Sequence, residues 1–222
     1  MEESRILFEI PLFGYNIGIS ESIVIQWVII LFLALLAWYF TRNLRKEPDK
    51  KQTVIEMFVK AINGVVRENM GEKYLGFVPY IGALVLFLLC MNLTGLFGFE
   101  PPTKEYSITL GMALITFVII QAYAIKKLGI LHYFIGYSKP SPILLPINIM
   151  ERIMLPVSLS FRLFGNILAG AVIIEMVYKA MGHFALALPI PLHAYFDLFD
   201  GSIQMVIFVM LSMVNIKSIA EH

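Results

Sequence analysis

One arginine lies in a segment where a charged side chain is costly. Arg162 stands in the stretch SFRLFGNILAG, residues 160–170, among leucine, isoleucine and phenylalanine. A guanidinium at the centre of a bilayer costs about 2.5–3.5 kcal/mol on insertion scales, and its pKa is too high for it to lose its proton. Arg162 must therefore face protein, water or an anion. It either forms a structural ion pair with a carboxylate of its own chain or contacts an anion from outside.

The neighbours of Arg162 form a polar stripe if this segment is an α-helix. At about 100° per residue, four polar side chains share one face or lie within one turn of it: Glu151, Ser158, Arg162 and Asn166. Gly165 and Ala169 lie beside the stripe, and small residues let a second helix approach closely. The surface therefore suits a neighbouring helix that carries a carboxylate.

The last apolar segment carries a second set of polar groups. Its members on one predicted helical face are Asp197, Asp200, Gln204 and Asn215, with His193 one turn before the first aspartate. These groups would be costly against lipid, so we expect them to face water or protein. Interhelical hydrogen bonds explain Gln204 or Asn215 equally well, and a solvated turn explains Asp200. Glu175 points roughly opposite Arg162, and two polar stripes on neighbouring helices indicate aqueous access from two sides.

Composition places the chain in a membrane. Its 222 residues are 59% hydrophobic and only 15% charged, with a mean hydropathy of +0.78, whereas soluble domains are about 45–50% apolar and about 25% charged. The net charge of +1 gives no reason to expect a nucleic-acid partner. The single cysteine, Cys90, excludes an internal disulfide.

Common catalytic motifs are missing from the sequence. It contains no CxxC or HExxH metal pattern, no GxGxxG or GxxxxGK[ST] nucleotide loop and no GxSxG nucleophile turn. We therefore expect no cofactor, no metal site and no ATP site within this chain.

Five segments have the length and polarity of membrane crossings: residues 22–40, 77–99, 106–125, 140–180 and 184–219. The first three are uncharged and close to the roughly 20 residues that a spanning helix needs, while the last two are longer and should be tilted. Prolines interrupt Pro140–Met150, which favours a re-entrant or interfacial piece there. Residues 1–21 are acidic rather than basic, unlike the start of a signal peptide.

Lysine and arginine gather in the link 41–76 and in the link after residue 125. Because positive charge marks cytoplasmic loops, five crossings place the N-terminus outside and the C-terminus inside. Apolar residues from Val54 to Val66 recur at helical spacing opposite a charged face, which predicts an amphipathic helix on the membrane or against the spans. The sequence predicts an all-α polytopic membrane protein with a single membrane domain, residues 1–222.

Three stretches carry a family resemblance that covers nearly the whole chain. PVSLSFRLFGNILAG (156–170) resembles the signature of subunit a of the rotary F-type ATP synthases of bacteria, NLTGLFGFEPP (92–102) is similar to its NLxGLxP motif, and QMVIFVMLSMVNI (204–216) resembles its last helix. The resemblance implies an ion-translocating stator subunit with two half-channels that carry protons or sodium ions to and from a ring of c subunits, driving ATP synthesis. It implies as partners the c-ring, the b-subunit stalk, the rest of the complex and the lipid of the bacterial cytoplasmic membrane.

The resemblance also implies residue roles. Arg162 matches the family's essential stator arginine, which faces the ion-binding carboxylate of each c subunit. Asn166 and Gln204 match polar positions near that arginine, and Glu151 is expected to line the inner channel. Many members carry a carboxylate or histidine nine residues after the arginine, where this chain has Ala171.

The change at that position suggests a shifted outer channel. Glu175 lies one turn beyond the missing group, and the family pairs that site with a titratable residue seven before the glutamine, which here is Asp197. We expect Glu175, Asp197 and His193 to form the outer pathway, with Asp200 as a further polar group on the ion path. The choice between proton and sodium depends on ligands in the c subunits.

Two other classes compete with this interpretation. A self-contained secondary transporter usually shows paired repeats, and residues 1–110 and 111–222 show no convincing repeat. A membrane-embedded metal enzyme would use Asp197, Asp200 and His193, but this set matches no recognised motif and holds one histidine.

Overall fold

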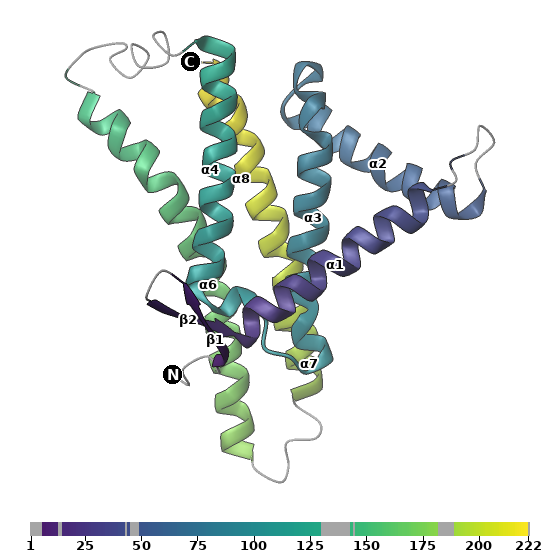
Figure 1. Cartoon of the computed structure of the whole chain (residues 1–222), viewed down its shortest axis with the longest axis vertical. Helices are drawn as coiled ribbons and strands as arrows, with labels where there is room; N and C mark the ends of the chain where they lie inside the picture. The colour runs from purple at the N-terminus through teal and green to yellow at the C-terminus, as the bar shows by residue number, and fades with distance from the viewer. Residues whose placement is uncertain are drawn as a thin grey trace.

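The chain folds into a bundle of long helices preceded by a small β-hairpin (Figure 1). The structure is a computed structural model that describes residues 6–12, 15–42, 44, 49–129, 143, 145–181 and 189–221. The elements in chain order are β1 (Ile6–Leu12), β2 (Tyr15–Ser20), α1 (Glu21–Thr41), α2 (Lys50–Asn69), η1 (Glu72–Phe77), α3 (Val78–Asn92), η2 (Leu93–Phe97), η3 (Pro102–Lys104), α4 (Tyr106–Leu128), α6 (Leu145–Met181), α7 (Pro189–His193), η6 (Ala194–Asp200) and α8 (Gly201–Glu221).

Among the described residues, five helical segments are long and apolar enough to cross a membrane, which confirms the predicted fold class. They are Glu21–Thr41, Glu72–Phe97, Tyr106–Leu128, Leu145–Met181 and Pro191–Ile219. The described ends of the chain lie towards opposite ends of the bundle (Figure 1). The hairpin was not expected: β1 and β2 pair antiparallel, and the Ser20 hydroxyl donates to Glu105 Oε2 at 3.2 Å. This bond ties the hairpin to the start of α4.

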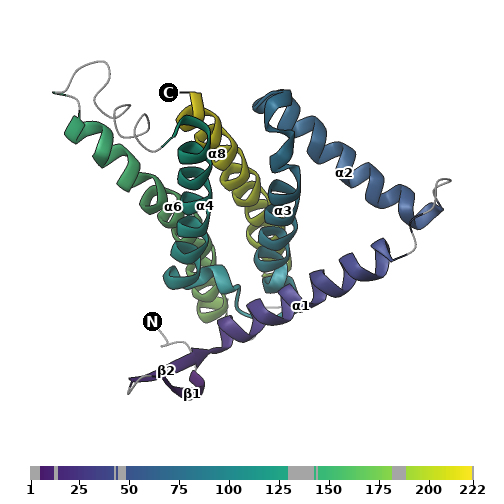
Figure 2. The ribbon, with the colours of Figure 1, turned by 45° about the horizontal axis from the view of Figure 1, so that its top comes forward.

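Helices α3, α4 and α8 lie side by side and form the centre of the bundle (Figures 1 and 2). Leu88, Ala113 and Met213, one from each helix, are fully buried. The outer helix α1 is different, because only Ser22 and Ile29 of its side chains are buried. Its apolar surface is therefore left for lipid or for another subunit.

Helix α2 is the amphipathic helix predicted in the link 41–76. The Asp49 side chain caps its start by accepting from the Lys50 amide at 2.8 Å. Ile62 and Val66 are buried against the spans, whereas Val54 is 67% exposed on another face. The helix was predicted to lie on the membrane or against the spans. It packs against the spans, and part of its apolar surface remains exposed.

The segment Pro140–Met150, predicted to be a re-entrant or interfacial piece, is in its described part the start of a longer helix. From Leu145 onwards these residues belong to α6 itself, which continues without a break to Met181; residues 140–142 and 144 lie outside the described chain. Pro146 occupies the first turn, where its missing amide hydrogen has no helical partner to lose. At 1.5 Å per residue the 37 residues of α6 span about 55 Å, more than a bilayer core of about 30 Å. Figures 1 and 2 show the first part of α6 leaning away from α4.

The last span is not a regular α-helix as predicted. Residues 182–188 lie outside the described chain, α7 begins at Pro189, and Ala194–Asp200 form a π-helix before α8 starts at Gly201. A π turn contains an extra residue relative to an α turn. This extra residue rotates Asp197 about the helix axis relative to Gln204. The predicted alignment of the two side chains on one α-helical face therefore does not hold.

Candidate functional site

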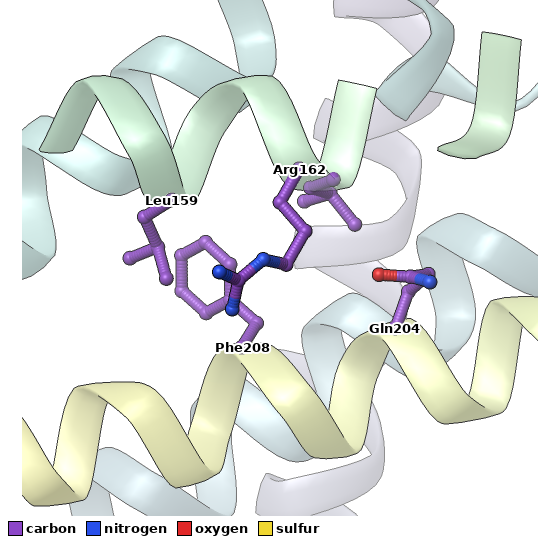
Figure 3. A pocket seen from close by; sticks show the side chains of 5 residues that line it. Leu159, Arg162, Gln204 and Phe208 are labelled. Atoms are coloured by element: carbon purple, nitrogen blue, oxygen red, sulfur yellow. The ribbon is translucent and has the colours of Figure 1, made fainter. Parts of the chain in front are cut away.

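Arg162 lies in a shallow pocket between α6 and α8. Its lining residues are Leu159, Arg162, Leu163, Gln204 and Phe208. Figure 3 shows the Arg162 side chain reaching from α6 past Phe208 towards α8, and the Gln204 amide pointing back towards α6. The structure thus brings together two residues that sequence analysis had placed on different helices, and adds Leu159 and Phe208 as apolar walls.

The guanidinium of Arg162 has no counter-charge within the described chain. Ion pairs in the described chain join Arg67 to Glu72, Lys104 to Glu100, Lys179 to Glu175 and His193 to Asp197, and none of them includes Arg162. Arg162 is exposed, whereas Gln204 is only 5% exposed. Two explanations were given for Arg162, an ion pair within its own chain and contact with an anion from outside. The described residues do not form such an ion pair.

The polar stripe predicted on α6 lies on an exposed face of the helix. Its members Glu151, Ser158, Arg162 and Asn166 are exposed, and so are Gly165 and Ala169 beside it. A methyl group added at Gly165 would meet nothing within 4 Å. The surface around Arg162 is consequently open and shallow, as a docking face for another helix requires.

His193 and Asp197 meet close to α6. His193 Nδ1 lies 2.6 Å from Asp197 Oδ2, and the side chains are 33% and 12% exposed. The other ring nitrogen, Nε2, lies 3.3 Å from the hydroxyl of Tyr178 on α6. Tyr178 was not predicted from the sequence, because nothing in the local pattern indicates contact with a residue 15 positions away.

The remaining predicted residues lie apart from that cluster. Glu175 is exposed and bound to Lys179, one turn along α6, at 2.6 Å. Asp200 is half-buried, as is Asn215, and Glu151 is exposed near the start of α6. The structure therefore joins His193 to Asp197 directly, but it does not join Glu175 to either by a hydrogen bond between described atoms.

The NLTG stretch has a positioning role that sequence analysis did not identify. Asn92, 1% exposed, donates from Nδ2 to the Gly201 carbonyl at 2.8 Å and accepts from Thr103 Oγ1 at 3.1 Å. A Cβ on Gly95 would lie 2.7 Å from Asp197 Cγ. These contacts hold the π-helix against η2, and so fix Asp197 and the start of α8.

The metal-enzyme alternative lacks a site in the described chain. No group of three or more histidine, cysteine, aspartate or glutamate side chains is placed there to hold a metal ion. The set His193, Asp197 and Asp200 does not form one, and only the first two make contact.

Comparisons with known proteins agree on one family. The family described as ATP synthase A chain matches residues 23–217. "ATP synthase subunit a 1" of Crocosphaera subtropica is 35% identical over 205 residues, which cover 91% of this chain and 87% of the relative. "ATP synthase subunit a 2" of Bradyrhizobium sp. is 34% identical over 214 residues, 96% of this chain and 92% of the relative.

A third relative is named for its ion. "ATP synthase subunit a, sodium ion specific" of Propionigenium modestum is 32% identical over 219 residues, covering 91% of this chain and 75% of the relative. The match extends over nearly the whole chain and overlaps all five candidate spans. The chain therefore belongs to the ATP synthase subunit a family, as a multi-pass bacterial membrane protein and the ion-translocating stator subunit of that complex.

Proposed function

We propose that Arg162 is the residue through which this stator subunit acts on its rotor, a ring of c subunits that each carry an ion-binding carboxylate. The observation that carries the proposal is an exposed guanidinium in a spanning helix without a counter-charge among the described residues. A cation within the apolar part of a membrane is stable only if an anion or water reaches it. A passing rotor carboxylate supplies that anion in turn.

The chemistry follows from electrostatics. A carboxylate close to a guanidinium has its pKa lowered by about 1–3 units, so each rotor carboxylate gives up its bound ion as it reaches Arg162. The same fixed charge repels cations that would otherwise cross directly between the two sides. The buried amide of Gln204, on the facing helix, lines the same pocket as the arginine (Figure 3).

Two half-channels complete the proposed path. The outer one contains Glu175, Asp197 and His193, and the inner one contains Glu151, with Asn166 beside the arginine and Asp200 as a further polar group. The distribution of lysine and arginine supports an N-terminus outside and a C-terminus inside the cytoplasmic membrane. The exposed apolar surface of α1 is compatible with lipid and with a b-subunit stalk.

The coupling ion in this proposal is a proton or a sodium ion. One relative is named as sodium ion specific, and the action of Arg162 on a carboxylate is the same for both cations. The rotor ligands, which lie in another chain, contribute to that choice.

The test uses the whole ATP synthase reconstituted in lipid vesicles. We expect Arg162→Ala to abolish ATP synthesis driven by an ion gradient, because nothing then displaces the ion from the rotor, while the soluble head still hydrolyses ATP. Arg152→Ala, on the same helix, is the matched control and should stay coupled. Retained ion-driven synthesis in the Arg162 variant would refute the proposal.

A further inference from the structure

We propose that the corner between α1 and α2 binds an anionic phospholipid, whose headgroup phosphate accepts from Arg42 and Lys51 and whose acyl chains lie along an exposed apolar face of α2. The inference goes beyond the proposed function and does not depend on the role of Arg162. Figures 1 and 2 show the end of α1 and the start of α2 meeting away from α4, α6 and α8. The corner therefore lies at the periphery of the bundle.

The sequence around the corner is basic. Residues 42–51 (RNLRKEPDKK) contain five lysine or arginine residues and two acidic residues. A cluster of about four to eight basic residues beside a spanning helix, or on an amphipathic helix, is typical of a segment that binds anionic lipid. The excess of positive charge therefore favours an anionic head group over a zwitterionic one.

Two aromatic rings position the cations at the corner. The guanidinium carbon of Arg42 lies 5.1 Å from the centroid of the Trp38 ring, and Lys51 Nζ lies 5.3 Å from the centroid of the Tyr39 ring. Lys51 also donates to the Tyr39 hydroxyl at 3.0 Å, which joins α2 to α1. Tryptophan and tyrosine at the end of an apolar helix, followed by basic residues, are typical of a membrane surface. The rings therefore hold both cations at the level of lipid head groups.

Both cations keep hydrogen-bond donors for a phosphate. A guanidinium has five N–H donors in its own plane, so contact with the face of a ring leaves them available for two parallel bonds to phosphate. The Lys51 ammonium has three donors, of which Tyr39 takes one. Neither cation belongs to an ion pair recorded between described residues, and Asp49 accepts from the Lys50 amide. A phosphate group can therefore accept from both side chains.

An exposed apolar face of α2 continues from the corner. This face, the apolar strip, consists of Val54, Met57, Ala61 and Val65. Their spacing of three and four residues places them on one side of the helix, and Val54 and Met57 are 67% and 65% exposed. Helix α2 packs on the spans through Ile62 and Val66, which lie about 100° further around its axis. The apolar strip is therefore free of that contact and suits acyl chains, as in an amphipathic helix at a membrane surface.

A phospholipid matches the corner and the apolar strip together. A protein on the same surface would have to supply an anionic group for Arg42 and Lys51 and an apolar face for the strip, whereas an anionic phospholipid carries both in one molecule. The bound lipid joins the end of α1 to the start of α2 through its phosphate.

The test uses the whole ATP synthase in phosphatidylcholine vesicles with a small fraction of a phosphatidylglycerol that carries a photoreactive acyl chain. After illumination, mass spectrometry of the isolated subunit maps the labelled residues. We expect labels on the apolar strip and at the end of α1, and far fewer from a phosphatidylcholine with the same photoreactive chain. Inorganic phosphate should not reduce the labelling relative to sodium chloride of equal ionic strength, because the site takes a lipid rather than a free anion.

Arg42→Gln and Lys51→Gln each remove one charge from an exposed position. We expect each to lower labelling by the phosphatidylglycerol probe about fivefold, the factor that corresponds to about 1 kcal/mol per basic residue near a membrane surface. The double variant should be labelled no more than by the phosphatidylcholine probe. Lys126→Gln is the matched control, because it removes one charge from an exposed position at the end of α4, and its labelling should equal that of the wild type.

Three results would overturn the lipid site. The first is equal labelling of the wild-type apolar strip by the two probes, a comparison that needs no variant to assemble. The second is wild-type labelling in the double variant, with subunit content confirming assembly. The third is an apolar strip without lipid labels, or labels that inorganic phosphate displaces, which would assign this surface to another subunit or to a free anion.

Discussion

The side-chain amide of Asn92 donates a 2.8 Å hydrogen bond to the carbonyl of Gly201, joining the end of α3 to the start of α8. Both residues are buried, and a Cβ on Gly201 would lie only 3.1 Å from Asn92 Cβ. The bond adds a side-chain donor to a backbone carbonyl at the point where the π-helix gives way to α8. It therefore sets the rotation with which Gln204, one turn later, faces Arg162.

Removing this bond should weaken the fold and the coupling together. In Asn92→Ala the fully buried Thr103 hydroxyl loses its acceptor and the Gly201 carbonyl loses its side-chain donor, and leaving a buried polar group unpaired costs about 1–3 kcal/mol. Asn69→Ala is the control, because Asn69 donates to Val65 in an exposed contact on its own helix. Thermal denaturation of the purified complex should show a lower midpoint for the Asn92 variant only. Equal midpoints in the two variants would contradict the positioning role.

Gly95 should be intolerant of even one methyl group. Its added Cβ would lie 2.7 Å from Asp197 Cγ, so Gly95→Ala must push the carboxylate away from His193. We expect slower ion uptake in reconstituted vesicles with normal assembly. Gly111→Ala in α4 is the matched change: nothing lies within 4 Å, and helix propensity favours alanine by about 1 kcal/mol. The account of Asp197 is wrong if both variants pump at the wild-type rate.

A carboxylate placed at residue 204 should trap Arg162. Gln204→Glu supplies an internal counter-charge across the pocket, and a rotor carboxylate then has to compete with a permanent one. We expect the complex to assemble while ATP-driven ion uptake falls by about tenfold or more, since a pair coupling of about 1.4 kcal/mol is enough for that factor. Gln204→Leu, which removes the amide without adding charge, should be less severe. A larger loss of ion uptake in Gln204→Leu than in Gln204→Glu would argue against an Arg162 that has no counter-charge in its own chain.

The proposed outer path predicts that substitutions of its residues slow ion flux without weakening assembly of the complex. Glu175 lies in an exposed ion pair with Lys179, and such pairs contribute about 0–1 kcal/mol. Glu175→Gln and Asp197→Asn should each slow ion flux while the complex still assembles, as judged by subunit content after purification. Glu68→Gln, at an exposed acid of α2, provides the control. Wild-type flux in both test variants would remove the shifted channel from the proposal.

The orientation of the chain can be tested with cysteine labelling, because Cys90 is the one native cysteine. In a Cys90→Ser background, Glu100→Cys reports the link between α3 and α4, and Lys126→Cys reports the end of α4. Both positions are exposed. A membrane-impermeant maleimide added to intact cells should label residue 100 and not residue 126. The opposite pattern would invert the proposed topology.

The sequence predicted best those features whose free-energy cost depends only on neighbouring residues. The cost of a guanidinium in an apolar helix identified Arg162, and helical spacing placed Glu151 and Asn166 on the face that is exposed in the structure. The number of crossings followed from segment length, which depends on the bilayer rather than on packing.

Features that depend on distant contacts were not predictable in this way. The π-helix at Ala194–Asp200 and the residue after it contact Gly95 and Asn92, which come from a different part of the chain. The contact of Tyr178 with His193 joins α6 to α7, which are separate elements of the chain. The hairpin of Ile6–Leu12 and Tyr15–Ser20 was not predicted, because only the charge of that segment was interpreted.

The central claim is that the counter-charge of Arg162 belongs to another chain. An experimental structure of the intact complex in lipid tests it most directly. The account predicts that the guanidinium faces the rotor, with a rotor carboxylate and no carboxylate of its own chain within about 4 Å. A guanidinium held by an internal acid such as Glu151 or Asp197 and turned away from the rotor would contradict the account.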